Sequence, residues 1–164
     1  MTPKQVALVQ KTFKSVAAIS EQAAELFYGR LFELDPSLKR LFKGDMKEQG
    51  RKLMAVIGVA VASLNNLEKI IPTVQKLGAK HAGYGVKEAD YATVANALLW
   101  TLEKGLGPDF TAEVKVAWTE TYQTLASVMI EASKNHEFDG VFLEFLAQAY
   151  QKIPELEKRQ NLEA

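Results

Sequence analysis

Cysteine is absent from this chain of 164 residues, and histidine occurs only twice. The absence of cysteine excludes disulfide bonds, thiolate metal sites, cysteine nucleophiles, iron–sulfur clusters and thioether-linked cofactors. Two histidines are also too few for a three-histidine zinc site. Any site built on histidine in this chain therefore has one or two imidazoles at most.

A net charge of either sign is also missing, since Lys+Arg and Asp+Glu both number 20. A neutral chain has no overall attraction for nucleic acid or for an anionic membrane. The longest mostly apolar run, at 53–64, has 12 residues, which is too short to span a bilayer and suits a buried helix. Residues 1–14 contain scattered lysines and no continuous apolar segment, so no signal peptide is predicted. We therefore expect a cytoplasmic protein that binds neither nucleic acid nor a membrane.

The hydrophobic pattern is helical nearly everywhere, and the sequence has neither alternating strand runs nor hairpin turns. An all-α fold is therefore predicted. Thr2 and Gln5 form a predicted capping box for the first helix, Ser20 is the predicted cap of the second, and Thr111 that of the last. The later helices are expected at about 46–64, 67–82, 87–104 and 111–133, with a short one from Pro36.

The chain divides by composition into a domain at 1–133 and a C-terminal extension at 134–164. Asp139-Gly140 opens an amphipathic stretch, and Pro154 ends it. An amphipathic helix followed by a frayed end is predicted there. This extension could pack back on the domain, pair with another subunit to form a homo-oligomer, pair with a different partner, or be disordered.

His81 ends an apolar helical stripe formed with Ile70, Val74 and Leu77. One interpretation is a buried histidine bonded to a backbone carbonyl. The other is an imidazole that points into an apolar cavity, as an axial ligand of haem iron would. The second histidine, His136, lies in a polar segment and is expected to be exposed to solvent.

Gln49 is the lone polar group on one face of the helix predicted at 46–64. Leu53, Ile57, Ala60 and Leu64 make up the rest of that face. Gln49 is therefore either a boundary residue or a neutral hydrogen-bond donor that points into a pocket.

These residues occur in an order and spacing that resemble the globins. The resemblance is to single-domain bacterial haemoglobins and to the globin domain of flavohaemoglobins, and more distantly to neuroglobin. It covers about residues 3–133 and implies a globin fold of about eight helices around a haem pocket, with the extra C-terminal helical tail beyond it. The segments that carry it are Leu26–Phe32, Asp35–Phe42, Gln49–Met54, Leu77–His81, Gly85-Val86, Ala117-Trp118 and Tyr122.

The resemblance implies haem b as cofactor, with His81 as the iron ligand and with its Nδ1–H facing a backbone carbonyl near Leu77, one turn back. Phe42 falls at the position that stacks on haem, and Leu53 at the apolar gate over the bound gas. Lys52 could reach a haem propionate or be an ordinary exposed lysine. The other implied haem-binding residues are Val86 and Tyr91.

Tyr28 and Gln49 fall at the positions that the family uses to contact a bound gas. Their hydroxyl and amide would stabilise O₂ by hydrogen bonds, which implies reversible, tight O₂ binding, with CO and NO as further ligands. Whether the protein is an enzyme stays open. The alternatives are a nitric oxide dioxygenase or other haem redox enzyme served by a separate reductase, and a gas or redox sensor.

Two features bear on the enzyme alternative. The residues after Ser133 leave no room for a reductase domain, and no flavin or nicotinamide glycine motif occurs. In flavohaemoglobins a Tyr and a Glu accompany the ligand histidine. Tyr91 matches the Tyr, but the Glu position is Ser133, and Glu131 projects elsewhere on the helix. This departure weakens the dioxygenase interpretation.

Overall fold

The computed structural model of the chain describes residues 1–134, and these residues are almost entirely helical. The prediction of an all-α fold is confirmed, because the described part contains α-helices and short 3-10 helices (η) and no strand. The C-terminal helix predicted within 134–164 lies outside the described residues. The elements are α1 (Pro3–Ala17), α2 (Ser20–Leu34), η1 (Pro36–Leu41), α3 (Met46–Ala62), η2 (Leu64–Lys69), α4 (Ile71–Gly83), α5 (Glu88–Leu106), η3 (Gly107–Asp109) and α6 (Ala112–Lys134).

The helix starts follow the capping residues in two of the three predicted places. Thr2 Oγ1 accepts a hydrogen bond from the Gln5 amide nitrogen, and Gln5 Oε1 accepts one from Thr2 N, so the capping box is confirmed. Thr111 Oγ1 accepts from Val114 N at the start of α6. The predicted Ser20 cap is wrong. Ser20 is already inside α2, because the Ile19 carbonyl accepts the bond from the amide of residue 23.

The helix predicted at 67–82 is divided in the structure. Residues 64–69 form η2, which is interrupted at Asn66 by a non-helical backbone conformation (φ −150°, ψ 63°), and α4 begins afresh at Ile71. Pro72 explains the fresh start, because proline lacks an amide hydrogen and is tolerated in the first turn of a helix only. The preceding helix, predicted to reach residue 64, ends at Ala62.

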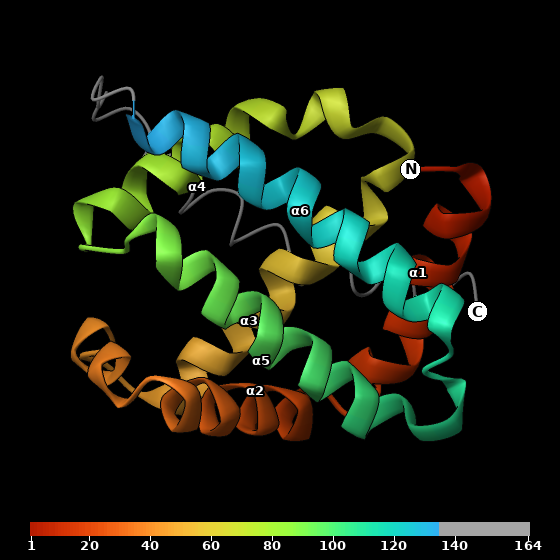
Figure 1. Cartoon of the computed structure of the whole chain (residues 1–164), viewed down its shortest axis with the longest axis horizontal. Coiled ribbons are helices and arrows are strands. Elements are labelled where there is room, and N and C mark those ends of the chain that lie inside the picture. The colour runs from red at the N-terminus through yellow and green to blue at the C-terminus, as the bar shows by residue number, and fades with distance from the viewer. Residues whose placement is uncertain (135–164) are drawn as a thin grey trace.

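The candidate site residues lie on helices that pack against different neighbours. α4 packs chiefly on α6, while α2 packs on α5 and on α3, and α1 packs on α3 and α6. Figure 1 shows α4 beside α6 at one end of the molecule, with α1 at the other. Gln49 and Leu53 therefore stand on a helix held by α1 and α2, and His81 on one held by α6.

Two hydrophobic clusters form the core. The larger joins α1, α3, α5 and α6 around Trp118, whose Nε1 donates a buried hydrogen bond of 2.9 Å to Thr12 Oγ1. The smaller lies between α2, α3, α5 and η1, and includes Phe27, Tyr28 and Leu38. The indole is large and polar at one edge, so its burial depends on the bond to Thr12.

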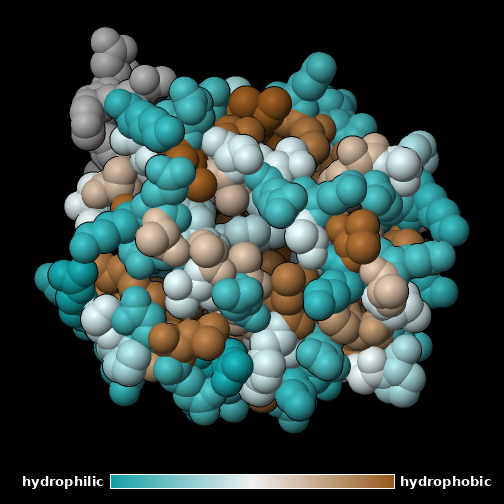
Figure 2. Space-filling model, in the orientation of Figure 1, coloured by the Kyte–Doolittle hydropathy of each residue, from teal (hydrophilic) through white to brown (hydrophobic). Residues whose placement is uncertain are grey.

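The surface is mixed in character. In the view of Figure 2, hydrophobic side chains form separate small groups among hydrophilic ones. Among residues 1–134 no helix is both long and apolar enough to cross a membrane.

Candidate functional site

Tyr28 and Gln49 meet through a hydrogen bond between α2 and α3. Gln49 Nε2 donates to the Tyr28 hydroxyl oxygen, with 3.3 Å between the two atoms. Tyr28 is buried, with 7% of its surface exposed, and Gln49 is half-buried in the first turn of α3. The structure therefore brings together the two side chains that the sequence analysis assigned to gas binding.

Aromatic side chains surround the Tyr28 ring. Phe27 and Phe42 contact it edge-on, with centroid distances of 5.1 and 5.2 Å, and Phe32 lies at 6.0 Å in a stacked arrangement. Phe42 follows η1 and also meets Phe32 edge-on at 5.5 Å. Such contacts leave the phenol ring little freedom. Sequence analysis did not single out Phe32, although its i, i+4 spacing from Tyr28 was the available signal.

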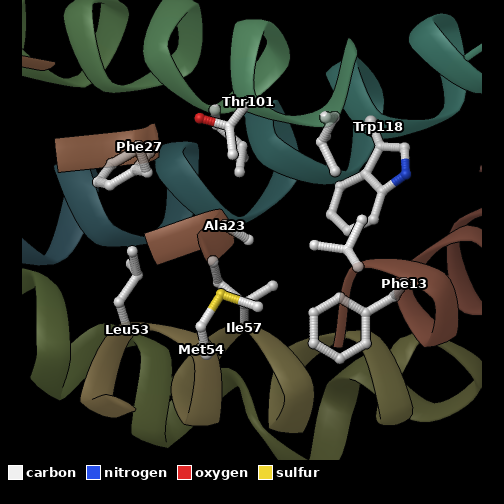
Figure 3. Close-up of a pocket in the computed structure, with 11 residues that line it drawn as sticks. Phe13, Ala23, Phe27, Leu53, Met54, Ile57, Thr101 and Trp118 are labelled. Atoms are coloured by element: carbon white, nitrogen blue, oxygen red, sulfur yellow. The ribbon is translucent and has the colours of Figure 1, made fainter. Parts of the chain in front are cut away.

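Leu53 lines a small apolar cavity of about 20 Å³. Figure 3 shows Leu53 and Phe27 at one end of it and Phe13 and Trp118 at the other. Thr101 brings a hydroxyl to the lining, but its Oγ1 donates to the Ala97 carbonyl at 2.8 Å. A cavity with no available polar partner stays dry. Leu53 therefore contacts the aromatic cluster around Tyr28 and also lines this apolar cavity.

The His81 ring is oriented by its own helix. Its Nδ1 lies 2.7 Å from the Leu77 carbonyl oxygen, one turn earlier in α4. A carbonyl can only accept, so Nδ1 carries the proton and the lone pair of the neutral ring is on Nε2. Burial lowers the pKa of His81; the Leu77 bond opposes this effect and nearby Lys80 adds to it. The ring is thus neutral at pH 7 and has a nitrogen that can bind a metal.

The end of α4 holds the backbone of His81 as well. Val86 N donates to the His81 carbonyl, Gly85 N donates to the Ala82 carbonyl, and Gly85 has φ +89°. This pair of bonds with a left-handed glycine is the Schellman motif that ends many helices. Val86, an implied haem-binding residue, is therefore tied to His81 by a backbone bond of 3.0 Å.

Tyr91 presents a buried hydroxyl without a hydrogen-bond partner among the described residues. Tyr122 bonds to the backbone of Tyr91 and not to its hydroxyl. The Tyr122 hydroxyl donates to the Tyr91 carbonyl oxygen, at a distance of 2.5 Å. Ser133 Oγ donates to a carbonyl of its own helix, and Glu131 is exposed. Within residues 1–134, neither side chain is a hydrogen-bond partner of the Tyr91 hydroxyl.

The remaining implied haem-binding residues lie at the edge of this region. Leu77 is half-buried beside His81 on α4. Lys52 is exposed and forms no ion pair within residues 1–134. Both interpretations of Lys52, a propionate partner or an ordinary exposed lysine, are compatible with this position.

A haem fits this set of residues better than a bare metal ion does. No group of three or more acidic, histidine or cysteine side chains could hold a metal within residues 1–134. A haem brings four nitrogen ligands of its own and needs one axial imidazole, which His81 can supply through Nε2. The buried Tyr91 hydroxyl has no hydrogen-bond partner among the described residues. Buried polar groups are usually bonded, so a group outside these residues is expected near it.

Comparison with protein families places most of the chain in a known family. The family model described as "Globin" matches residues 25–129. Curated relatives include the flavohemoprotein of Xylella fastidiosa (strain 9a5c), 30% identical over 78% of this chain, and the neuroglobin of Danio rerio, 31% identical over 84% of it. The match spans 33% of the flavohemoprotein and 96% of the neuroglobin. The chain thus spans about a third of the length of the flavohemoproteins that it matches.

Solved structures show the same fold. A bacterial globin from Campylobacter jejuni superposes with a TM-score of 0.72 at 27% identity, covering 82% of this chain and 97% of the other. An engineered carbene transferase, derived from a candidate nitric oxide dioxygenase of Rhodothermus marinus, gives a TM-score of 0.74 at 24% identity, covering 82% and 94%. Both likenesses extend over nearly the whole of the solved chains.

Proposed function

The chain belongs to the globin family, and we propose that it binds O₂ reversibly at the ferrous iron of haem b, with His81 as the iron ligand. Bound haem supplies an iron centre with an open position for a diatomic gas. Tyr28 and Gln49 act as hydrogen-bond donors that slow the release of O₂. CO and NO are the other gases expected at the same position.

The hydrogen bond between Gln49 and Tyr28 carries this proposal. Because Gln49 donates to the phenol oxygen, it polarises the hydroxyl and strengthens the phenol as a donor. An electron-rich diatomic ligand is held more tightly by such donors in a buried pocket than it would be in water. Each donor is worth about 1–2 kcal/mol, which corresponds to about 5- to 30-fold in the rate of release.

The contacts of His81 favour binding of iron at its Nε2 atom. The Leu77 carbonyl fixes the tautomer that leaves Nε2 unprotonated, and the same bond orients the ring and increases its basicity as a ligand. We assign the haem contacts to the residues around it: Phe42 stacks on the macrocycle, Leu53 covers the gas position, Lys52 pairs with a propionate, and Leu77, Val86 and Tyr91 pack on the His81 side.

Slow release suits some roles better than others. Transport requires the protein to give up its ligand readily, whereas scavenging or sensing of O₂ does not. The two donors at Tyr28 and Gln49 therefore favour scavenging or sensing over transport.

An optical spectrum of the purified protein in the ferric, ferrous and CO-bound states tests the proposal. We expect an intense Soret band that is lost in His81→Ala. His136→Ala is the matched control and keeps the band, because the sequence predicts an exposed side chain in a polar segment. A protein that takes up no haem, or a His81→Ala variant with an unchanged ferrous spectrum, would refute the assignment of the iron ligand.

A nitric oxide dioxygenase with a separate reductase is the second candidate. The flavohemoprotein relatives favour it, whereas the Tyr91 hydroxyl, which lacks a carboxylate partner among the described residues, speaks against it. Oxidation of NO in a single turnover, followed by sustained turnover when a reductase is added, would establish this activity. A single turnover that is not followed by catalysis would favour the O₂-binding role.

The division into a globin domain at 1–133 and an extension at 134–164 is part of the same proposal. Truncation after Ser133 tests it. We expect the shortened chain to keep its Soret band. A lower molecular mass of the assembly would assign the extension to a homo-oligomer, and an unchanged mass would exclude that role.

A further inference from the structure

Gly78 in α4 lies against the backbone of α6. Of the glycines in the described chain, it leaves the least room for a side chain. A Cβ placed on Gly78 would fall within 2.7 Å of the Met129 carbonyl carbon, and still closer to the oxygen and Cα of the same residue. All three are backbone atoms, so no side chain can rotate away to make room. A methyl group at residue 78 therefore requires one helix to move relative to the other.

The rest of the α4–α6 contact means that α4 would move as a whole and not only at residue 78. Val74, one turn before Gly78, is buried on the same side of α4, and α6 is the main packing partner of α4. Side chains in such an interface are close-packed and do not yield by small local adjustments. Gly78 thus sets how near the axis of α4 lies to that of α6.

His81 moves with α4 because it belongs to that helix and two hydrogen bonds hold it there. It follows Gly78 by three residues in the same helix, its Nδ1 is bonded to the Leu77 carbonyl, and its own carbonyl is bonded to Val86 N. A shift or rotation of α4 therefore carries the imidazole with it.

We propose that Gly78 is a positioning residue for the iron ligand: its close contact with the Met129 backbone determines where His81 stands relative to the haem. The inference rests on the proposed function for its readout at the iron. Its geometric core is the close contact between the backbones of α4 and α6. Because residue 78 has no side chain, α4 can lie close to α6, and this position of α4 places the His81 imidazole one turn away.

Gly78→Ala tests the proposal, with Gly83→Ala as the matched control. Gly83 is in the same helix, and a Cβ added there would meet open space. In the ferrous haem-loaded protein we expect the iron–histidine stretching band and the CO association rate to change in Gly78→Ala and to be unchanged in Gly83→Ala. Val74→Ala separates position from stability, because it should lower the unfolding temperature while leaving the band in place.

The helix spacing is measured in the full-length protein as purified. The chain has no cysteine, so cysteines introduced at exposed Gln75 in α4 and exposed Ser127 in α6 are the only sites for spin labels. We expect the distance distribution between the labels to shift in Gly78→Ala only. Unchanged distances and an unchanged iron–histidine band would overturn the proposal. If the unaltered protein binds no haem, the proposed function fails, while the label distances still decide the role of Gly78.

Hydrogen exchange of the unaltered protein decides the case in which Gly78→Ala does not fold. The close contact predicts that residues 74–81 and the facing part of α6 are protected to a similar degree. Much faster exchange in α4 than in α6 would show that α4 separates on its own, and would contradict a fixed spacing.

Discussion

The side-chain amide of Gln49 donates a hydrogen bond to the hydroxyl of Tyr28 across 3.3 Å. The bond joins α2 to α3 and sets the two groups side by side, although they are 21 positions apart in the sequence. Phe27, Phe32 and Phe42 hold the phenol ring in place from three sides. The relative position of the phenol hydroxyl and the side-chain amide is thereby fixed.

Removal of the phenol hydroxyl should speed the release of O₂. In Tyr28→Phe we expect the O₂ dissociation rate to rise several-fold, because about 1–2 kcal/mol of hydrogen bonding is lost. Stopped-flow measurement on the haem-loaded protein gives this rate. CO accepts hydrogen bonds poorly, so its dissociation serves as the control and should change less. An O₂ rate equal to that of the unaltered protein would remove Tyr28 from the role of donor.

Gln49 should leave the iron position open, because a neutral amide is a poor iron ligand. The ferrous protein is therefore expected to be largely five-coordinate, and Gln49→His to become six-coordinate and low-spin, because imidazole binds haem iron well. Optical spectra of the two ferrous proteins distinguish these states. A low-spin spectrum with two axial ligands in the unaltered protein would contradict the expectation.

Tyr122 should make the fold sensitive to alkaline pH. Burial, and then the nearby Tyr91, raise the pKa of Tyr122 far above its ordinary value of about 10. The folded state keeps the proton while the unfolded state loses it above that value, so the contribution of Tyr122 is fully present at lower pH and declines as the pH rises.

Tyr122→Phe tests this. Loss of the bond to the Tyr91 carbonyl should cost about 1 kcal/mol at neutral pH, and the decline of stability between neutral and strongly alkaline pH should become shallower. Denaturant unfolding across that pH range provides the measurement. Tyr84, which is 59% exposed, gives the control variant Tyr84→Phe, which is expected to change stability little. Equal pH profiles for Tyr122→Phe and the unaltered protein would contradict the assignment.

The turn after α4 should depend on Gly85. Gly85→Ala places a Cβ in the left-handed conformation at φ +89°, which costs about 1–2 kcal/mol. We expect lower stability and faster loss of haem, because the Schellman motif holds the backbone of His81. Thermal unfolding and haem transfer to an acceptor protein measure the two effects. Gly83→Ala, where the Cβ meets open space, should show neither, and equal behaviour of the two variants would count against this role of the turn.

Local chemistry made several features readable from the sequence. The box at Thr2 and Gln5 and the cap at Thr111 depend on residues three positions apart, so the pattern alone was sufficient. The bond between His81 and Leu77 is equally local, because the two residues are one helical turn apart. The errors were local too: Ser20 can cap a helix, yet α2 starts one residue earlier because Ile19 already accepts its first bond.

By itself the sequence determined the all-α class, most helix boundaries and the resemblance to a globin site at Tyr28, Phe42, Gln49 and His81, because helical periodicity and residue order are properties of the chain. Only the tertiary structure decided which groups meet. The Tyr28–Gln49 bond, the unsatisfied Tyr91 hydroxyl and the contact of Gly78 with Met129 all depend on how helices distant in sequence are packed. Such contacts are set by the three-dimensional fit of side chains and backbones in a dense interior, and that fit has no counterpart in the local pattern.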